Sequence, residues 1–151
     1  MLAVQASQGH SFHFWRPVLA QQRLVAPARE MLNTVGLADQ ADTPVSVLAH
    51  GARRQLEIAM TLAMGPKLLL LDEPMAGMSQ LESQSVIALL QKLKGQYAIV
   101  LVEHDMDAIF ALADRISVLV YGKVIACGTP QEIRDDAEVR IAYLGDQEMV
   151  S

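Results

Sequence analysis

The stretch KLLLLDEP, residues 67–74, decides the fold. Four consecutive leucines indicate a short strand buried on both faces of a parallel sheet. Asp72 and Glu73 follow directly, at the carboxyl end of the strand, where function gathers in such sheets. Because charge is costly to desolvate without a partner, the two carboxylates indicate a hydrated Mg²⁺ on a nucleotide phosphate. The alternative is a structural strand that ends in a solvated Asp-Glu turn.

Three further segments flank this strand in a definite order. They read LAHGARRQLEIAM at 48–60, MAGMS at 75–79 and IVLVEHD at 99–105. Together the four segments resemble the ABC-type ATPase domain: a signature motif, a Walker B strand with its glutamate, a D-loop and a switch histidine. The resemblance runs from about residue 48 to the C-terminus, and more loosely back to the start.

The resemblance implies a role for three side chains. Asp72 would hold Mg²⁺ through water, since magnesium dehydrates reluctantly and usually takes one carboxylate plus phosphate oxygens. Glu73 would be the general base, or the group that orients the hydrolytic water. His104 would be catalytic too, because an imidazole at a strand end can hydrogen-bond the γ-phosphate and sense its loss. The expected cofactors are therefore ATP and Mg²⁺.

The resemblance implies that two segments contact ATP, and that the first of them, the signature, faces the ATP held by an opposing subunit. The first opens a helix, and helix N-termini bind anions through free N–H groups. The sequence departs from the family pattern in three places: Ala49 replaces Ser, Ala52 replaces Gln or Glu, and Ser79 replaces Asp. The implied contact residues are Leu48, Ala49, His50, Gly51 and Ala52 of the signature, and Ala76, Gly77, Met78 and Ser79 of the D-loop.

A P-loop requires the pattern G-x-x-x-x-G-K-[ST], and the 151 residues do not contain it. Together with the resemblance, this absence implies an α/β fold that is similar to the C-terminal part of a P-loop NTPase (RecA-like) parallel-sheet core, beginning after the Q-loop, plus most of the ABC helical subdomain. Residues 1–66 would be the helical subdomain and residues 67–151 the core with its tail. The isolated chain is expected to be inactive as an ATPase, because Walker A is absent.

Composition limits the partners. A net charge of −5 and a pI near 5.3 argue against nucleic acid, whose phosphates require a basic face. The sequence has no apolar run long enough for direct membrane insertion and no signal-peptide pattern at its start. The resemblance implies a second ABC ATPase subunit and transmembrane permease subunits as partners. It places the chain at the cytoplasmic face of the inner (plasma) membrane, peripheral through those permease subunits.

The sequences of the motifs most resemble those of the ATPase subunits of branched-chain amino acid importers. The segments that carry this resemblance are 50–51, 54–59, 73–78, 128–130 and 142–145. Importers of urea or short amides are the alternative within the same branch. A different class of function is also open, a truncated, non-catalytic interaction module that cannot hydrolyse ATP alone. The aromatic residues Phe12, Phe14 and Trp15 have two equally supported interpretations: a surface that docks to a membrane subunit, or ordinary packing within the subdomain.

The periodicity of apolar residues predicts the remaining elements. Asp105 is predicted to cap a helix. Thr129 and Glu132 are predicted to form a capping box, and a last short helix is expected to reach about Leu144. Cys127 lies in an apolar strand-like run, which indicates a buried structural thiol. The predicted helices are 27–36, 51–64 and 81–94, the predicted strands are 67–72 and 97–103, and a hairpin is expected over 116–120 and 124–127.

Overall fold

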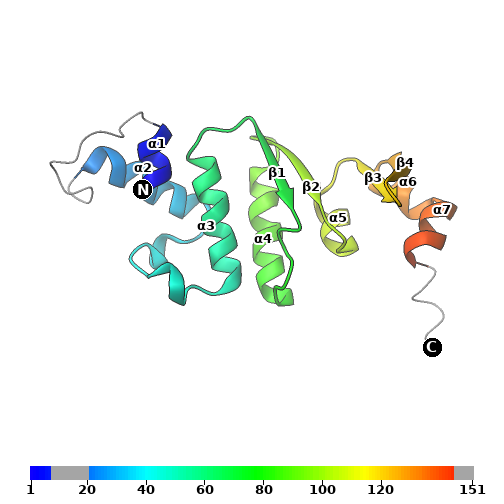
Figure 1. The fold of residues 1–151 in the computed structure, drawn as a ribbon, viewed down its shortest axis with the longest axis horizontal. Coiled ribbons are helices and arrows are strands. Elements are labelled where there is room, and N and C mark those ends of the chain that lie inside the picture. The colour runs from blue at the N-terminus through cyan, green and yellow to red at the C-terminus, as the bar shows by residue number, and fades with distance from the viewer. Residues whose placement is uncertain (8–20, 145–151) are drawn as a thin grey trace. The chain divides into compact units, whose positions relative to one another are not determined.

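The structure is a computed structural model that describes residues 1–7 and 21–144, so Phe12, Phe14 and Trp15 lie outside the described residues. It forms two compact units, which divide after Glu103. The division into subdomains at residue 66 stays a prediction. The first unit contains α1 Leu2–Ser7, α2 Gln22–Thr34, α3 His50–Leu62, β1 Leu68–Asp72, α4 Gln80–Leu93 and β2 Ala98–Val102, with 3-10 turns at Ala38–Gln40 and Val45–Val47 (Figure 1).

A parallel pair of strands forms the sheet of the first unit, as the sequence predicts. β1 and β2 pair in a register that sets Leu68 opposite Ala98 and Asp72 opposite Val102. Parallel neighbours need a crossover connection, and α4 supplies it. The inward-facing residues of α4 are buried, with Val86 fully so and Leu90 and Leu93 only 1% exposed. The β1–α4–β2 unit thus supports the acidic pair at the end of β1.

The expectation that β1 is buried on both faces is wrong for the described residues. Leu69 is 1% exposed, whereas Leu68 and Leu70, which point to the opposite face of the strand, are 53% and 70% exposed. Val100 and Val102 on β2 are about half exposed as well. The physical reason is that a two-stranded sheet with one crossover helix has a covering layer on one face only. We call Leu68, Leu70, Val100 and Val102 the open apolar face.

The helices before the sheet pack in sequence, with α3 between α2 and α4 (Figure 1). α2 begins at Gln22, so the prediction of a helix start at Pro27 is wrong, and Pro27 lies inside the helix. A proline there lacks the N–H for an i→i−4 bond. Burial of Leu24 and Ala28 against Val4 explains the earlier start, because these side chains need the additional turn to reach the small core.

The second unit begins at His104 and contains α5 Met106–Leu112, β3 Ile116–Val120, β4 Lys123–Gly128, α6 Pro130–Asp135, α7 Ala137–Val139 and a π-helical turn Arg140–Leu144. The predicted hairpin is confirmed, since β3 and β4 pair antiparallel. Its tip has positive φ at both Tyr121 and Gly122, as a two-residue hairpin turn of type I′ requires. A core of Ile116, Val118, Ile133 and Val139 lies beneath it.

Cys127 is exposed on β4, which corrects the prediction of a buried thiol. Side chains alternate along a strand, so an apolar run does not by itself bury every member. Hydrogen bonds to Sγ, first from Ser117 Oγ and then from Arg115, lower the pKa of the thiol below its ordinary value.

The other predicted helices and strands agree with the structure to within three residues at the ends that were predicted, except that the predicted last helix is divided at Asp136 into α6, α7 and the π-helical turn. Asp105 Oδ1 accepts a hydrogen bond from the Ala108 N–H and caps α5, as predicted. Thr129 and Glu132 form the predicted capping box at the start of α6. Of the helices in the described ranges, none combines the length and the apolar character that crossing a membrane would need.

Candidate functional site

The acidic pair lies where the first strand ends. Asp72 is the last residue of β1, and both Asp72 and Glu73 are exposed. The Glu73 N–H donates to the carbonyl oxygen of Val102 at 2.9 Å, so the ladder continues one residue beyond the strand. Glu73 has a φ of 40°, in the left-handed region that a residue with a Cβ rarely adopts. Strain of this kind persists only where surrounding contacts enforce it, and it is found most often at functional sites.

The segment Glu73–Ser79 forms a folded loop between β1 and α4. The Ala76 N–H donates to the Glu73 carbonyl oxygen at 3.1 Å, and the Met78 N–H donates to that of Met75 at 3.2 Å. Gly77 completes the turn with a φ of 72°, which glycine adopts without strain. Pro74 and Met75 are buried and anchor the loop.

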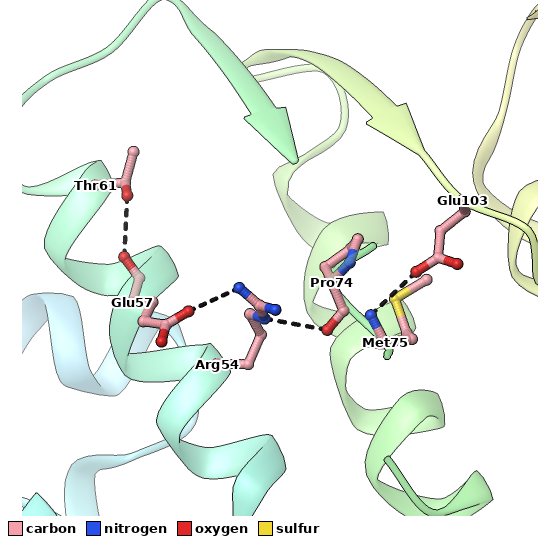
Figure 2. A network of polar contacts seen from close by, with 6 residues as sticks. All are labelled: Arg54, Glu57, Thr61, Pro74, Met75 and Glu103. Atoms are coloured by element: carbon pink, nitrogen blue, oxygen red, sulfur yellow. Dashed lines mark hydrogen bonds and ion pairs between the residues drawn. The ribbon is translucent and has the colours of Figure 1, made fainter. Parts of the chain in front are cut away.

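Side chains from two other elements hold this loop (Figure 2). Arg54 on α3 donates from Nε to the Pro74 carbonyl oxygen at 3.2 Å and from Nη1 to Glu57 at 2.8 Å. From the end of β2, Glu103 Oε1 accepts a hydrogen bond from the Met75 N–H at 3.0 Å. The backbone at Pro74 and Met75, just after Glu73, is therefore held by one side chain from α3 and one that follows β2.

The signature segment opens α3, as predicted. Leu48 is buried, Ala49 is the N-cap residue and has no side-chain cap hydrogen bond, and His50 is exposed. Arg53 folds back and donates to the carbonyl oxygens of Leu48 at 3.0 Å and Ser46 at 2.9 Å. These bonds fix the chain as it enters the helix.

Glu82 bonds two of the candidate site segments, and the sequence analysis missed it. Its Oε1 accepts from the Gly51 N–H at 3.0 Å, and its Oε2 accepts from the N–H and Oγ of Ser79 at 3.1 and 2.7 Å. These bonds, with that from Gly51 the largest cause, lower the pKa of Glu82 to about 2. The pattern Ser79-x-x-Glu82 is a capping box, so the cap at α4 was readable from the sequence. The bond to Gly51 was not.

The structure thus brings part of the predicted site together. Glu82 joins the signature segment to the D-loop residue Ser79, and Arg54 joins the same helix to the loop after Glu73. His104, the first residue of the second unit, is exposed and follows Glu103 at the end of β2. Over residues 1–7 and 21–144, no group of three or more His, Cys, Asp or Glu side chains is arranged to hold a metal ion.

Comparisons with known proteins place the chain in a family. The model of the ABC transporter family matches residues 5–76, and that of the branched-chain amino acid ATP-binding cassette transporter matches residues 123–148. Two solved structures share the fold. The chain superposes with a TM-score of 0.77 on the ADP conformation of MJ1267, an ATP-binding cassette of an ABC transporter, at 22% identity over 95% of this chain and 61% of that one. It superposes with a TM-score of 0.71 on cbiO1 from Clostridium perfringens, part of the ABC transporter complex cbiONQ, at 25% identity over 98% of this chain and 61% of that one.

Curated relatives are more similar in sequence. The chain is 38% identical over 129 residues to LivG of Escherichia coli strain K12, a high-affinity branched-chain amino acid transport ATP-binding protein, covering 84% of this chain and 51% of LivG. It is 39% identical to BraF of Pseudomonas aeruginosa, of the same description, over 79% of this chain and 48% of BraF. The chain spans about half the length of these relatives. Motifs, fold and relatives agree, and the chain belongs to the family of ABC transporter ATP-binding proteins, with the branched-chain amino acid type as its near relatives.

Proposed function

We propose that this chain is the catalytic and dimer-forming part of an ATP-hydrolysing subunit of an ABC importer. The observation that supports the proposal most is the exposed pair Asp72–Glu73 at the end of a parallel strand, with the backbone beyond it fixed by Arg54 and Glu103. An exposed carboxylate pair on a backbone held in this way suits metal-assisted hydrolysis of a phosphate.

Asp72 suits a hydrated Mg²⁺. It is exposed at the end of β1, and a magnesium ion bound with ATP needs one or two carboxylates, its other ligands being water and phosphate oxygens. The lack of a ready-made metal cluster among the described residues is compatible with this arrangement. When bound, the ion neutralises the charge that develops on the phosphate oxygens.

Glu73 then accepts a proton from the attacking water, or orients that water for attack. Its left-handed backbone directs the chain out of the strand direction directly after Asp72. His104 donates a hydrogen bond to the γ-phosphate from an imidazole N–H. The signature residues 48–52 and the D-loop residues 76–79 contact the ATP held by a second subunit, which couples ATP binding to dimerisation.

The relatives support the rest of the proposal. LivG and BraF are described as branched-chain amino acid transport ATP-binding proteins, so we infer the same class of cargo for the importer that this chain serves. Urea or short amides are the alternative cargo. The partners are a second ATPase subunit and transmembrane permease subunits, which hold the chain at the cytoplasmic face of the inner membrane.

A hybrid ATPase tests the chemistry. It consists of this chain preceded by the portion of Escherichia coli LivG that lies before the matched residues, and the 151-residue chain alone sets the baseline. Glu73→Gln in the hybrid should lower the rate of phosphate release by roughly two to four powers of ten, the range for a positioned general base. Glu30→Gln, an equal change at an exposed glutamate of α2, should leave the rate unchanged. Near-normal turnover by Glu73→Gln would assign the base elsewhere.

Transport tests the cargo. The hybrid gene is placed in an Escherichia coli strain that lacks LivG, and uptake of radiolabelled leucine is compared with uptake of urea. Leucine uptake that is lost in the Glu73→Gln hybrid supports the branched-chain assignment. Uptake of urea alone would replace it with the alternative.

A further inference from the structure

One carboxylate joins the two segments that are proposed to meet the second subunit's ATP. Glu82 lies in the first turn of α4, and its two oxygens bond different partners: Oε1 accepts from Gly51, 31 residues earlier in the chain, and Oε2 accepts from Ser79. The capping box alone would need only the second of these. The first bond links α4 to the start of α3.

This bond replaces a cap that α3 lacks. The first N–H groups of a helix have no partner within the helix, and an N-cap side chain usually satisfies one of them. Ala49 occupies the N-cap position and has no oxygen to offer. The Gly51 N–H, at the second helical position, is satisfied by Glu82 instead.

The two helices approach closely at this point. A Cβ added to Gly51 would lie 3.0 Å from the Glu82 Cβ and 3.2 Å from its Cγ, closer than side chains normally pack. Gly51 is buried and contacts α4 because it has no side chain. The start of α3 is therefore tied to α4 through one hydrogen bond and one close contact, in addition to the bonds that Arg53 makes within the signature segment.

We propose that Glu82 is a positioning residue for ATP-dependent dimerisation, which holds the signature turn at Gly51 and the D-loop residue Ser79 in one fixed relation. The proposal rests on the proposed function, in which both segments contact the same opposing nucleotide. If the two segments move independently, the donors that face the phosphate lose their alignment. A misplacement of about 1 Å in such a site can cost up to about a hundredfold in rate.

The chain contains a matched control. Thr129 and Glu132 form a capping box of the same type at α6, with hydrogen bonds of 2.7 Å from the Thr129 N–H and 3.0 Å from Oγ1 to Glu132 Oε2. The described hydrogen bonds of the Glu132 carboxylate all come from its own box, in the second unit. Glu132→Ala therefore removes a capping box without removing a bond between helices.

The first measurement is amide hydrogen exchange of the 151-residue chain. Because the Gly51 N–H has no partner within α3, its protection reports on Glu82 directly. Glu82→Ala should accelerate exchange at Gly51, and Glu132→Ala should not. A Gly51 amide that exchanges at the unprotected rate in the unchanged chain would overturn the proposal, whatever the hybrid does.

The second measurement is dimerisation of the hybrid ATPase in the Glu73→Gln background, followed by light scattering across ATP concentrations. Glu82→Ala should raise the ATP concentration at half-maximal dimerisation at least about fivefold, while the affinity of the separated subunit for ATP is unchanged. Glu82→Gln keeps a carbonyl oxygen for the Gly51 N–H and should restore most of the loss. Glu132→Ala should match the reference.

An unchanged midpoint in Glu82→Ala would overturn the proposal. A lowered midpoint would also overturn it, since it would mean that Glu82 competes with phosphate for the Gly51 N–H or repels it. The proposed function fails separately, if the unmodified hybrid neither hydrolyses ATP nor dimerises with it. In that case the exchange result would still support the hydrogen bond between Glu82 and Gly51, but the role of Glu82 in dimerisation would be rejected together with the proposed function.

Discussion

Arg54, on the helix that the signature segment opens, donates a hydrogen bond to the carbonyl oxygen of Pro74, the residue directly after Glu73. The side chain of Arg54 is 30% exposed, so water competes only in part for this bond. The position of the acidic loop therefore depends on α3 as well as on the strand that carries it.

Arg54→Ala should destabilise the chain by about 1–1.5 kcal/mol, the usual worth of a partly buried hydrogen bond. Glu57→Ala breaks only the i,i+3 ion pair between Arg54 and Glu57, whose carboxylate is 62% exposed, and should cost about 0.2–0.5 kcal/mol. Urea unfolding of both variants measures the difference. Equal losses would mean that the bond to Pro74 contributes nothing.

The backbone conformation at Glu73 predicts that a glycine variant at this position is more stable than an alanine variant. With φ at 40°, any side chain with a Cβ is strained, so Glu73→Gly should be more stable than Glu73→Ala by about 0.5–1 kcal/mol after the entropy of the unfolded glycine is counted. At the strand residue Asp72 the order should reverse, because glycine weakens a strand. Melting temperatures of Glu73→Gly, Glu73→Ala, Asp72→Gly and Asp72→Ala give the comparison. The same order of stability at both positions would contradict backbone strain at Glu73.

Glu82 should make stability depend on pH in the acid range. Its folded-state pKa of about 2 lies below the ordinary 4.5, so the folded state binds fewer protons between these values. The stabilisation is fully present above about pH 4.5 and is lost as the pH falls toward 2.

The stability difference between the unchanged chain and Glu82→Gln should therefore shrink as the pH is lowered. Urea midpoints measured at several values from about pH 6 to about pH 3 test this. A difference that is constant with pH would mean that the carboxylate is not held by Gly51 and Ser79 in solution.

The open apolar face should drive self-association of the 151-residue chain. Leu70 is 70% exposed on that face, and exposed apolar strand surfaces invite pairing. Leu70→Lys should shift the chain toward the monomer in sedimentation velocity runs at increasing concentration. Leu81→Lys, at a leucine that is 75% exposed on α4, should not. Similar behaviour of both variants would show that this face is not the contact.

Most of the fold was predictable because its elements carry strong local signals. The runs that became β1 and β2 are almost wholly apolar, and Thr129 with Glu132 marks the start of α6. The start of α2 was not predictable from Pro27, because burial of Leu24 in the small core outweighed the usual position of proline.

The site was predictable in its parts and not in its connections. The sequence motifs nominated Asp72, Glu73 and Gly51 as candidates, and the S-x-x-E pattern at Ser79 was present in the sequence although it was not used to predict the cap of α4. The bonds from Gly51 to Glu82 and from Arg54 to Pro74 join residues that are 31 and 20 positions apart. Such contacts depend on how α3 packs against α4 and the loop, which no periodicity within either helix encodes.

The loop between β1 and α4 has a practical consequence for protein engineering. Its conformation is held by side chains from three different elements as well as by hydrogen bonds within residues 73–79. A graft of this loop into another cassette would need Arg54, Glu82 and Glu103 to travel with it. The transferable unit is a set of positions scattered over about fifty residues, and a cut made at the ends of the loop would leave most of that set behind.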